Sequence, residues 1–156
     1  MIKAYLVILP TFFVAFVLAI FPLAKYLDYV RPEWVAMTLI FWVLVSPSRV
    51  GIFMGLCMGL LLDVLHGQIL GLNALALSVL AYLCMLLHSR MRLYNTIQQS
   101  CLVFVLVGLY LLVSYWSESI VVGQGNIALL WPSLGSALIW PIWYNLLSAV
   151  RRYFRA

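Results

Sequence analysis

Residues 51–71 read GIFMGLCMGLLLDVLHGQILG. Within them a glycine or an acid returns at every fourth position, in the order Gly51, Gly55, Gly59, Asp63, Gly67 and Gly71. Gly-x-x-x-Gly spacing lets a second membrane helix approach until the two backbones touch. The surrounding apolar side chains offer an ionised carboxylate no water, so Asp63 needs either a partner or a function. The stretch predicts a close-packed helical hairpin with an acid beside its seam.

The composition of the whole chain is typical of a membrane protein. Of 156 residues, 67% are hydrophobic and 8% are charged, whereas a soluble domain is roughly half apolar and a quarter charged. Lipid cannot hydrogen-bond backbone amides, so spanning segments are helices or closed barrels, and the apolar runs here lack the alternation of a barrel strand. We therefore expect an all-α integral membrane protein with no separate soluble domain.

The apolar runs divide the chain into six expected spans within one transmembrane domain, residues 1–156. They cover about 4–24, 34–46, 50–65, 72–87, 97–117 and 127–150. The first run is too long for a signal peptide and no small-residue cleavage site follows it, so we interpret it as a retained span. The second and third cover only about 20 to 25 Å. They must tilt, lie protected inside the bundle, or thin the membrane locally.

The distribution of cations predicts the orientation. Six spans place most of the basic residues on one side, namely Lys3, Arg49, Arg90, Arg92, Arg151, Arg152 and Arg155, and leave Lys25 and Arg31 on the other. Cytoplasmic loops carry the excess of Lys and Arg, so both termini are expected in the cytoplasm. The basic tail could also hold anionic headgroups or an acidic partner, but we favour a topology signal.

Residues able to carry out chemistry are few. The cysteines have no metal or redox spacing and are expected to pack in the spans; they are Cys57, Cys84 and Cys101. The best enzymatic arrangement combines Asp63 and His66 on one helix face with Glu118 from the fifth span, as a metal site or an acid–base pair. A catalytic metal usually takes three protein ligands, and no further ligand has suitable spacing. We expect no catalytic, cofactor or metal site.

Asp63 is better explained as a structural acid. A four-residue step drifts by about 40° around a helix, so Asp63 flanks the glycine groove. Its carboxylate could accept hydrogen bonds from the amides at residues 71–73, where the next helix begins, or pair with Arg31. Asp63→Asn should then be tolerated, Asp63→Leu worse and Gly59→Leu worst.

The fourth span repeats the small residues of the third. Gly71, Ala74, Ser78 and Ala81 fall on one side of it. The two small-residue surfaces indicate internal packing between the third and fourth spans, with a seam for a second protein as the alternative.

Together these residues resemble a known family. The pattern is Gly55-x-x-x-Gly59-x-x-x-Asp63-x-x-x-Gly67-x-x-x-Gly71-x-Asn73-Ala74, followed by Ala81-Tyr82 and preceded by Arg31-Pro32-x-Trp34. It is similar to the central hairpin of the MreD family of rod shape-determining membrane proteins, in its proteobacterial branch. The resemblance is specific between residues 31 and 82 and covers the rest of the chain only in layout.

The resemblance implies a non-enzymatic subunit of the bacterial cell-elongation machinery in the inner membrane. MreD proteins lie beside MreC, which contacts the peptidoglycan polymerase RodA and its partner penicillin-binding transpeptidase, and the cytoplasmic side is linked to the MreB filament. The implied fold is a six-helix bundle similar to the substrate-binding subunits of vitamin (energy-coupling factor) transporters. Membrane lipid is an expected partner; nucleic acid and cofactors are not.

That fold similarity also gives the alternative, a small-molecule-binding subunit of a transporter. Such subunits dock a transport module through an Ala-x-x-x-Ala face on the first helix, and Ala15 and Ala19 have this spacing. A specific ligand site needs convergent polar groups, and beside the charges the outer loops offer only Gln68, Asn73, Gln124 and Asn126. A shape-complex subunit is therefore favoured.

Overall fold

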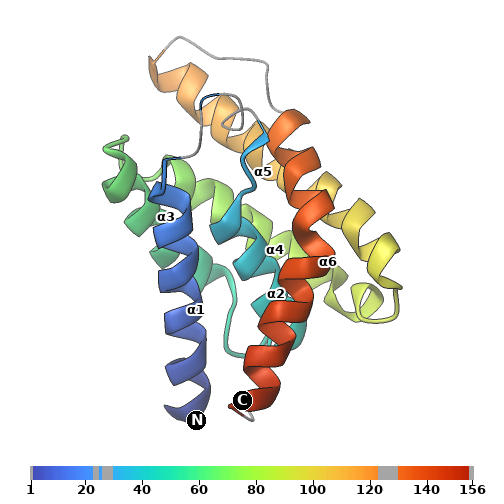
Figure 1. Cartoon of the computed structure of the whole chain (residues 1–156). Coiled ribbons are helices and arrows are strands. Elements are labelled where there is room, and N and C mark those ends of the chain that lie inside the picture. Colours follow the sequence, from blue (N-terminus) through green and yellow to red (C-terminus); the bar gives the residue numbers. More distant parts are fainter. Residues whose placement is uncertain (1, 23–24, 26–29, 123–129, 155–156) are drawn as a thin grey trace.

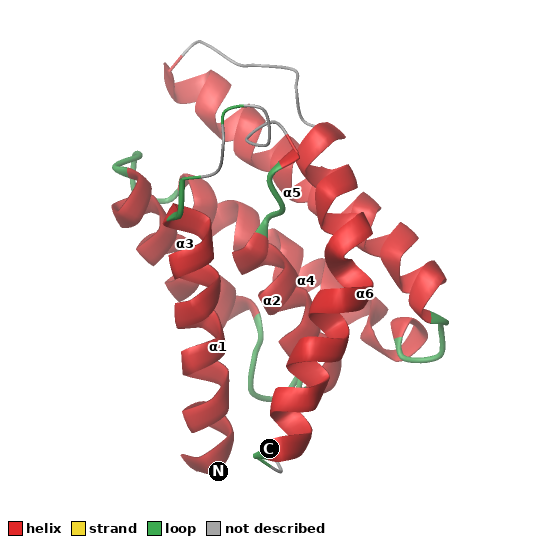
Figure 2. Cartoon of the chain, in the orientation of Figure 1, coloured by secondary structure: helices red, strands yellow, loops and turns green. Residues whose placement is uncertain are grey.

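The computed structural model describes residues 2–22, 25, 30–122 and 130–154. These residues form helices packed against one another (Figure 1, Figure 2). The helices are α1 (Ile2–Ile20), α2 (Trp34–Val45), α3 (Ile52–His66), α4 (Leu72–Met91), α5 (Thr96–Val122) and α6 (Leu130–Tyr153). The described part of the chain is thus an all-helical protein with six helices, one for each apolar run.

The helix ends follow from local chemistry. α1 stops at Ile20, before the predicted end at residue 24, because Pro22 disfavours helical geometry at the residue before it. Residues 23–24 and 127–129, which belong to the predicted first and sixth spans, lie outside the described residues. α4 and α5 both run beyond their predicted ends, to Met91 and Val122.

α2 is the centre of the bundle. It has 12 residues, and all of residues 35–44 are buried. It contacts α1, α4, α5 and α6, and two indole nitrogens connect it to its neighbours: Trp42 Nε1 donates to Thr11 Oγ1 at 2.8 Å, and Trp143 Nε1 donates to Thr38 Oγ1 at 3.2 Å. A helix enclosed by protein on all sides need not match the bilayer thickness, so burial explains the short second span.

α3 is short for another reason. It packs mainly on α4, and its outer face is apolar and exposed, with Phe53 at 79% and Val64 at 64%. Protection inside the bundle therefore does not apply to α3. Tilt and local thinning of the membrane stay as the two predicted explanations.

Within the residues that the structure describes, two helices are long and apolar enough to cross a membrane by length and composition, α4 and the segment Thr96–Ile120 of α5. α2 and α3 are apolar but shorter, as is the segment Tyr5–Ile20 of α1. The first turn of α1 and the last turn of α6 lie at the same end of the molecule (Figure 1). This arrangement agrees with an even number of crossings.

Candidate functional site: the α3–α4 hairpin

Asp63 connects the end of α3 to the start of α4. Its side chain is completely buried. Oδ2 accepts hydrogen bonds from the Gly71 N–H at 2.9 Å and the Ala74 N–H at 3.4 Å, and Oδ1 accepts one from the Asn73 N–H at 2.9 Å. These amides are among the donors that a helix leaves without intrahelical partners at its N-terminus, where the helix dipole is positive. Asp63 thus caps α4 from the preceding helix, which is the first of the two arrangements expected for it.

The same residue takes part in ending α3. The Gln68 N–H donates to the Asp63 carbonyl at 3.0 Å and the Gly67 N–H to the Val64 carbonyl at 3.2 Å. Gly67 has φ 63°, and together these features form a Schellman motif. The backbone carbonyl of Asp63 therefore helps to end α3, while its side chain caps the N-terminus of α4.

The periodic glycines fall into two groups. Gly67 and Gly71 were expected to pack against a helix, but a Cβ at either position would meet nothing within 4 Å. They are required for backbone conformation instead, because φ is 63° at Gly67 and 108° at Gly71. The four-residue spacing continues past the end of α3, where a helical stripe no longer exists.

Gly55 and Gly59 form the close seam. A Cβ on Gly59 would lie 2.6 Å from both the Ala74 nitrogen and the Asn73 carbonyl oxygen. A Cβ on Gly55 would lie 2.8 Å from the Leu77 carbonyl oxygen. Both glycines thus pack directly on the α4 backbone, so the small residues serve internal packing of the hairpin.

The other small residues of the hairpin lie at or near this seam. Ala74 and Ala81 are buried, and Ala81 is 3.3 Å from the Cβ position of Gly55. Ser78 is half-buried and donates its hydroxyl to the Ala74 carbonyl of its own helix at 2.7 Å. Gly51 precedes α3, and a Cβ at this position would lie 3.4 Å from the sulfur of the flexible Met85 side chain. The seam is therefore tightest around Gly55 and Gly59.

A polar chain extends from the hairpin to α5. Asn73 Nδ2 donates to Gln68 Oε1 at 2.8 Å, and the Tyr110 hydroxyl donates to Asn73 Oδ1 at 3.0 Å. Tyr110 is 4% exposed. The sequence interpretation missed Tyr110, although a hydroxyl inside an apolar span must find a partner. The available signal was Asn73, which has four hydrogen-bonding positions to satisfy.

Arg31 is not the partner of Asp63. Its Nη2 donates to the carbonyls of Leu18 at 3.3 Å and Phe21 at 3.2 Å, which lie at the C-terminal end of α1. A cation is favoured there by the negative end of the helix dipole. The predicted Arg31–Asp63 pair is therefore replaced by a cap on α1.

The turn that contains Arg31 is held against α6. The Glu33 N–H donates to Ser136 Oγ at 3.0 Å. Gly135 approaches the Val30 carbonyl so closely that a Cβ could not fit between them. The absence of a side chain at Gly135 and the hydroxyl of Ser136 thus fix the entry to α2.

The enzymatic arrangement considered from sequence does not form among the described residues. Asp63 is buried with both carboxylate oxygens bonded, while His66 and Glu118 are exposed. No group of three His, Cys, Asp or Glu side chains that could hold a metal occurs in the described part of the chain. Cys57, Cys84 and Cys101 are free thiols, half-buried, buried and exposed respectively.

The basic residues lie mainly on the surface. Arg49, Arg90, Arg92 and Arg152 are exposed, Arg151 is half-buried, and Arg155 lies outside the described residues. Gln124 and Asn126, two of the polar outer residues, also lie outside them. Exposed guanidinium groups at the ends of apolar helices fit a membrane interface.

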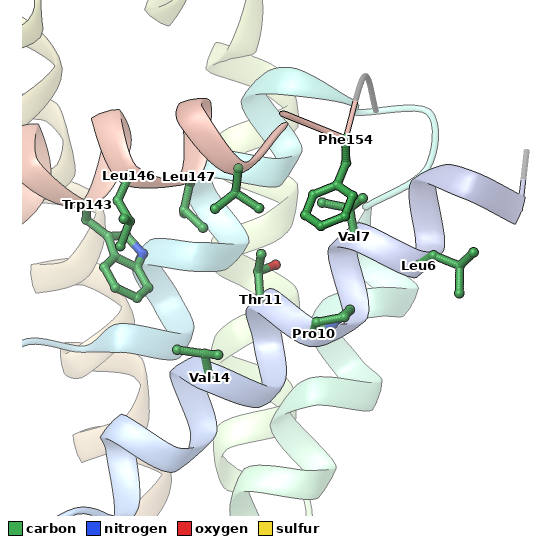
Figure 3. A pocket seen from close by; sticks show the side chains of 10 residues that line it. Leu6, Val7, Pro10, Thr11, Val14, Trp143, Leu146, Leu147 and Phe154 are labelled. Carbon is green, nitrogen blue, oxygen red and sulfur yellow. The ribbon is translucent and has the colours of Figure 1, made fainter. Parts of the chain in front are cut away.

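An apolar groove separates α1 from α6, with a volume of about 240 Å³ (Figure 3). Leu6, Pro10 and Val14 of α1 face Trp143 and Leu146 of α6 across it. The Thr11 hydroxyl is its main polar group, and this hydroxyl already donates to the Ile8 carbonyl and accepts from Trp42. The groove therefore offers hydrocarbon contact and no reactive group.

The docking face that the transporter alternative would use on the first helix is turned inward. Ala15 is completely buried and Ala19 is half-buried. A buried alanine cannot present an Ala-x-x-x-Ala surface to a transport module. This placement removes the feature that supported the transporter alternative.

Comparison with known proteins places the chain beside one family. A family model described as rod shape-determining protein MreD matches residues 1–150. The rod shape-determining protein MreD of Haemophilus influenzae is 30% identical over 152 residues, which are 97% of this chain and 94% of that relative. No solved structure matches the chain. The expected likeness to vitamin transporter subunits stays a prediction.

Proposed function

This chain belongs to the MreD family of rod shape-determining proteins, and from that premise we propose that it is a non-catalytic subunit of the bacterial cell-elongation machinery. It resides in the inner membrane, crosses it six times and keeps both termini in the cytoplasm. Its partner is MreC, and through MreC it acts on RodA and the penicillin-binding transpeptidase, with MreB on the cytoplasmic side.

The hydrogen bonding of the Asp63 carboxylate is the observation that supports a non-catalytic role. An acid inside a membrane protein is by default a candidate for proton or ion chemistry. Here both of its oxygens accept backbone hydrogen bonds that hold α4 against α3. The acid maintains shape, as expected for a scaffold.

The mechanism is conformational support. The seam at Gly59, the Asp63 cap and the Tyr110–Asn73 bond fix the hairpin at three separate points. A bundle held in this way presents a constant surface against which the single membrane helix of MreC is kept. The position of that helix then determines how MreC presents itself to the synthase.

The test is purification of the tagged chain in a mild detergent, with identification of the proteins that accompany it. We expect MreC together with RodA and its transpeptidase. Vitamin-binding or ATPase subunits in their place would overturn the proposal.

The matched control for this purification uses two glycines. Gly59→Ala should lower the recovery of MreC because it opens the seam. Gly108→Ala should not, since a Cβ at Gly108 meets nothing within 4 Å. Equal recovery of MreC with both variants, at equal membrane abundance, would show that MreC binding does not depend on the packing of the α3–α4 hairpin.

A further inference from the structure

We propose that a polar pocket between α1, the turn before α2 and the end of α3 binds the phosphate group of a membrane lipid. The pocket has a volume of about 170 Å³. Its polar walls come from Arg31, Glu33, Trp34 and His66, and Ala19 and Leu62 contribute apolar walls. It differs from the α1–α6 groove, which has almost no polar lining.

Arg31 is held in place for this role. Its two hydrogen bonds to other described residues both leave from Nη2, to the carbonyls of Leu18 and Phe21. A guanidinium has five N–H donors in a rigid fork, so fixing one nitrogen orients the others without using them all. Phosphate oxygens are the acceptors that such a fork binds best.

Two further donors lie around the pocket. The Trp34 indole nitrogen is buried and has no hydrogen-bond partner among the described residues. A buried donor without an acceptor is uncommon in folded proteins, and Trp34 is one of the residues that line the pocket. The exposed His66, at the end of α3, lies near enough to Arg31 for their charges to interact.

Glu33 is a titratable group in the pocket, and its protonation state should affect anion binding. Burial raises the pKa of this carboxyl to about 7, although Arg31 lowers it. Below that pH a neutral Glu33 can donate to a phosphate oxygen, and above it the carboxylate repels the anion. The other charged or titratable groups around it are Arg31 on the same turn, His66 and Asp63 on α3, and Tyr110 on α5.

The surroundings of the pocket favour a lipid over free phosphate. Ile20 and Phe21, at the end of α1, are 52% and 64% exposed. On α3, Leu65 is 47% exposed. A phosphodiester in the pocket could lay its acyl chains along these side chains, which inorganic phosphate cannot use.

The experiment measures binding to the detergent-purified, delipidated full chain by native mass spectrometry and thermal shift. The probes are phosphatidylglycerol, diacylglycerol with the same chains, and inorganic phosphate. We expect phosphatidylglycerol to bind and stabilise the protein and the other two to have little effect. Equal binding of diacylglycerol would overturn the phosphate site, and equal stabilisation by inorganic phosphate would overturn its assignment to a lipid.

Substitutions of residues in the pocket test whether the lipid binds there. Arg31→Gln should weaken phosphatidylglycerol binding by about tenfold, the loss expected for charge-assisted hydrogen bonds. The exposed Arg49→Gln, in the α2–α3 turn, is the matched control and should bind like the wild type. His66→Gln tests the site without disturbing the α1 cap and should weaken binding by a smaller factor. Wild-type affinity in both Arg31→Gln and His66→Gln would overturn the proposal.

The pH dependence gives an independent readout. Affinity should fall between pH 6 and 8 as Glu33 ionises around its pKa of about 7. Glu33→Gln keeps a neutral donor and should remove most of that fall while retaining binding. An unchanged pH profile in Glu33→Gln would exclude Glu33 from the site.

Discussion

At the scale of single residues, the hairpin depends on the Asp63 carboxylate, whose two oxygens accept hydrogen bonds from different amides. Oδ1 accepts from Asn73, and Oδ2 accepts from Gly71 and Ala74. An ionised group buried in an apolar environment is costly unless it is hydrogen-bonded, and these amides at a helix N-terminus supply both hydrogen bonds and positive potential. The geometry changes one expectation from the sequence, that an amide side chain would be tolerated at position 63.

Asp63→Asn should destabilise the protein. An amide offers one acceptor oxygen and places an NH₂ group against backbone N–H donors on the other side. The loss should be about 1 to 3 kcal/mol, the cost of a buried donor without an acceptor. Asp63→Leu should cost more, because all of the capped amides lose their acceptor. Thermal unfolding in detergent and membrane abundance measure both effects.

A contrary result for Asp63→Asn would be informative. If this variant kept its melting temperature and abundance while cells lost rod shape, the negative charge would act in proton or ligand chemistry. The structural role of Asp63 would then be secondary.

At the scale of secondary-structure elements, α3 and α4 form one unit because their backbones are in contact. Gly59 lies against the Ala74 nitrogen and the Asn73 carbonyl. Backbone atoms cannot move aside as a flexible side chain can. A single methyl group at position 59 is therefore already too large.

Gly59→Ala should lower the free energy of unfolding by about 1 to 3 kcal/mol, because overpacking forces the helices apart. Gly108→Ala is the matched control and should be neutral or slightly stabilising, since its Cβ meets open space and Ala is the better helix former. Chemical or thermal unfolding of the two purified variants compares them directly. Equal stability would show that the seam yields more easily than its geometry indicates.

Local features of the hairpin could be predicted from sequence, and non-local ones could not. The small-residue spacing predicted a hairpin between the third and fourth spans, and the amides near Gly71 were among the expected partners of Asp63. Tyr110 could not be assigned to Asn73, because 37 residues separate the two in the chain and no local spacing relates them. The central position of α2 was also hidden, because a uniformly apolar helix has no face that marks its neighbours.

At the scale of the whole molecule, the first turn of α1 and the last turn of α6 lie at the same end, and exposed arginines lie near the ends of several helices. Six crossings follow if every helix spans the membrane. Reporter fusions after residues 48, 92 and 156 should then be cytoplasmic, and fusions near 29, 68 and 124 periplasmic. A periplasmic C-terminus would mean five crossings and would reassign the loops.

Deletion of the gene should turn rod-shaped cells round, because the chain belongs to a rod shape-determining family. Shape should return with the wild-type chain and with Gly108→Ala. Cell length and width, measured by microscopy, report the effect. Normal rods after a clean deletion would contradict a role in shape.

The enclosure of α2 bears on how the protein is made. Trp143 of α6 contacts α2 twice, with its ring centroid 4.9 Å from that of Trp34 and its indole N–H bonded to Thr38. α6 is synthesised after α2, so the side of α2 that Trp143 contacts is covered only once α6 is in place. Until then the Thr38 hydroxyl lacks the Trp143 indole that donates to it. Chains truncated before α6 should therefore be degraded by membrane proteases, and the cell should accumulate only copies that contain α6.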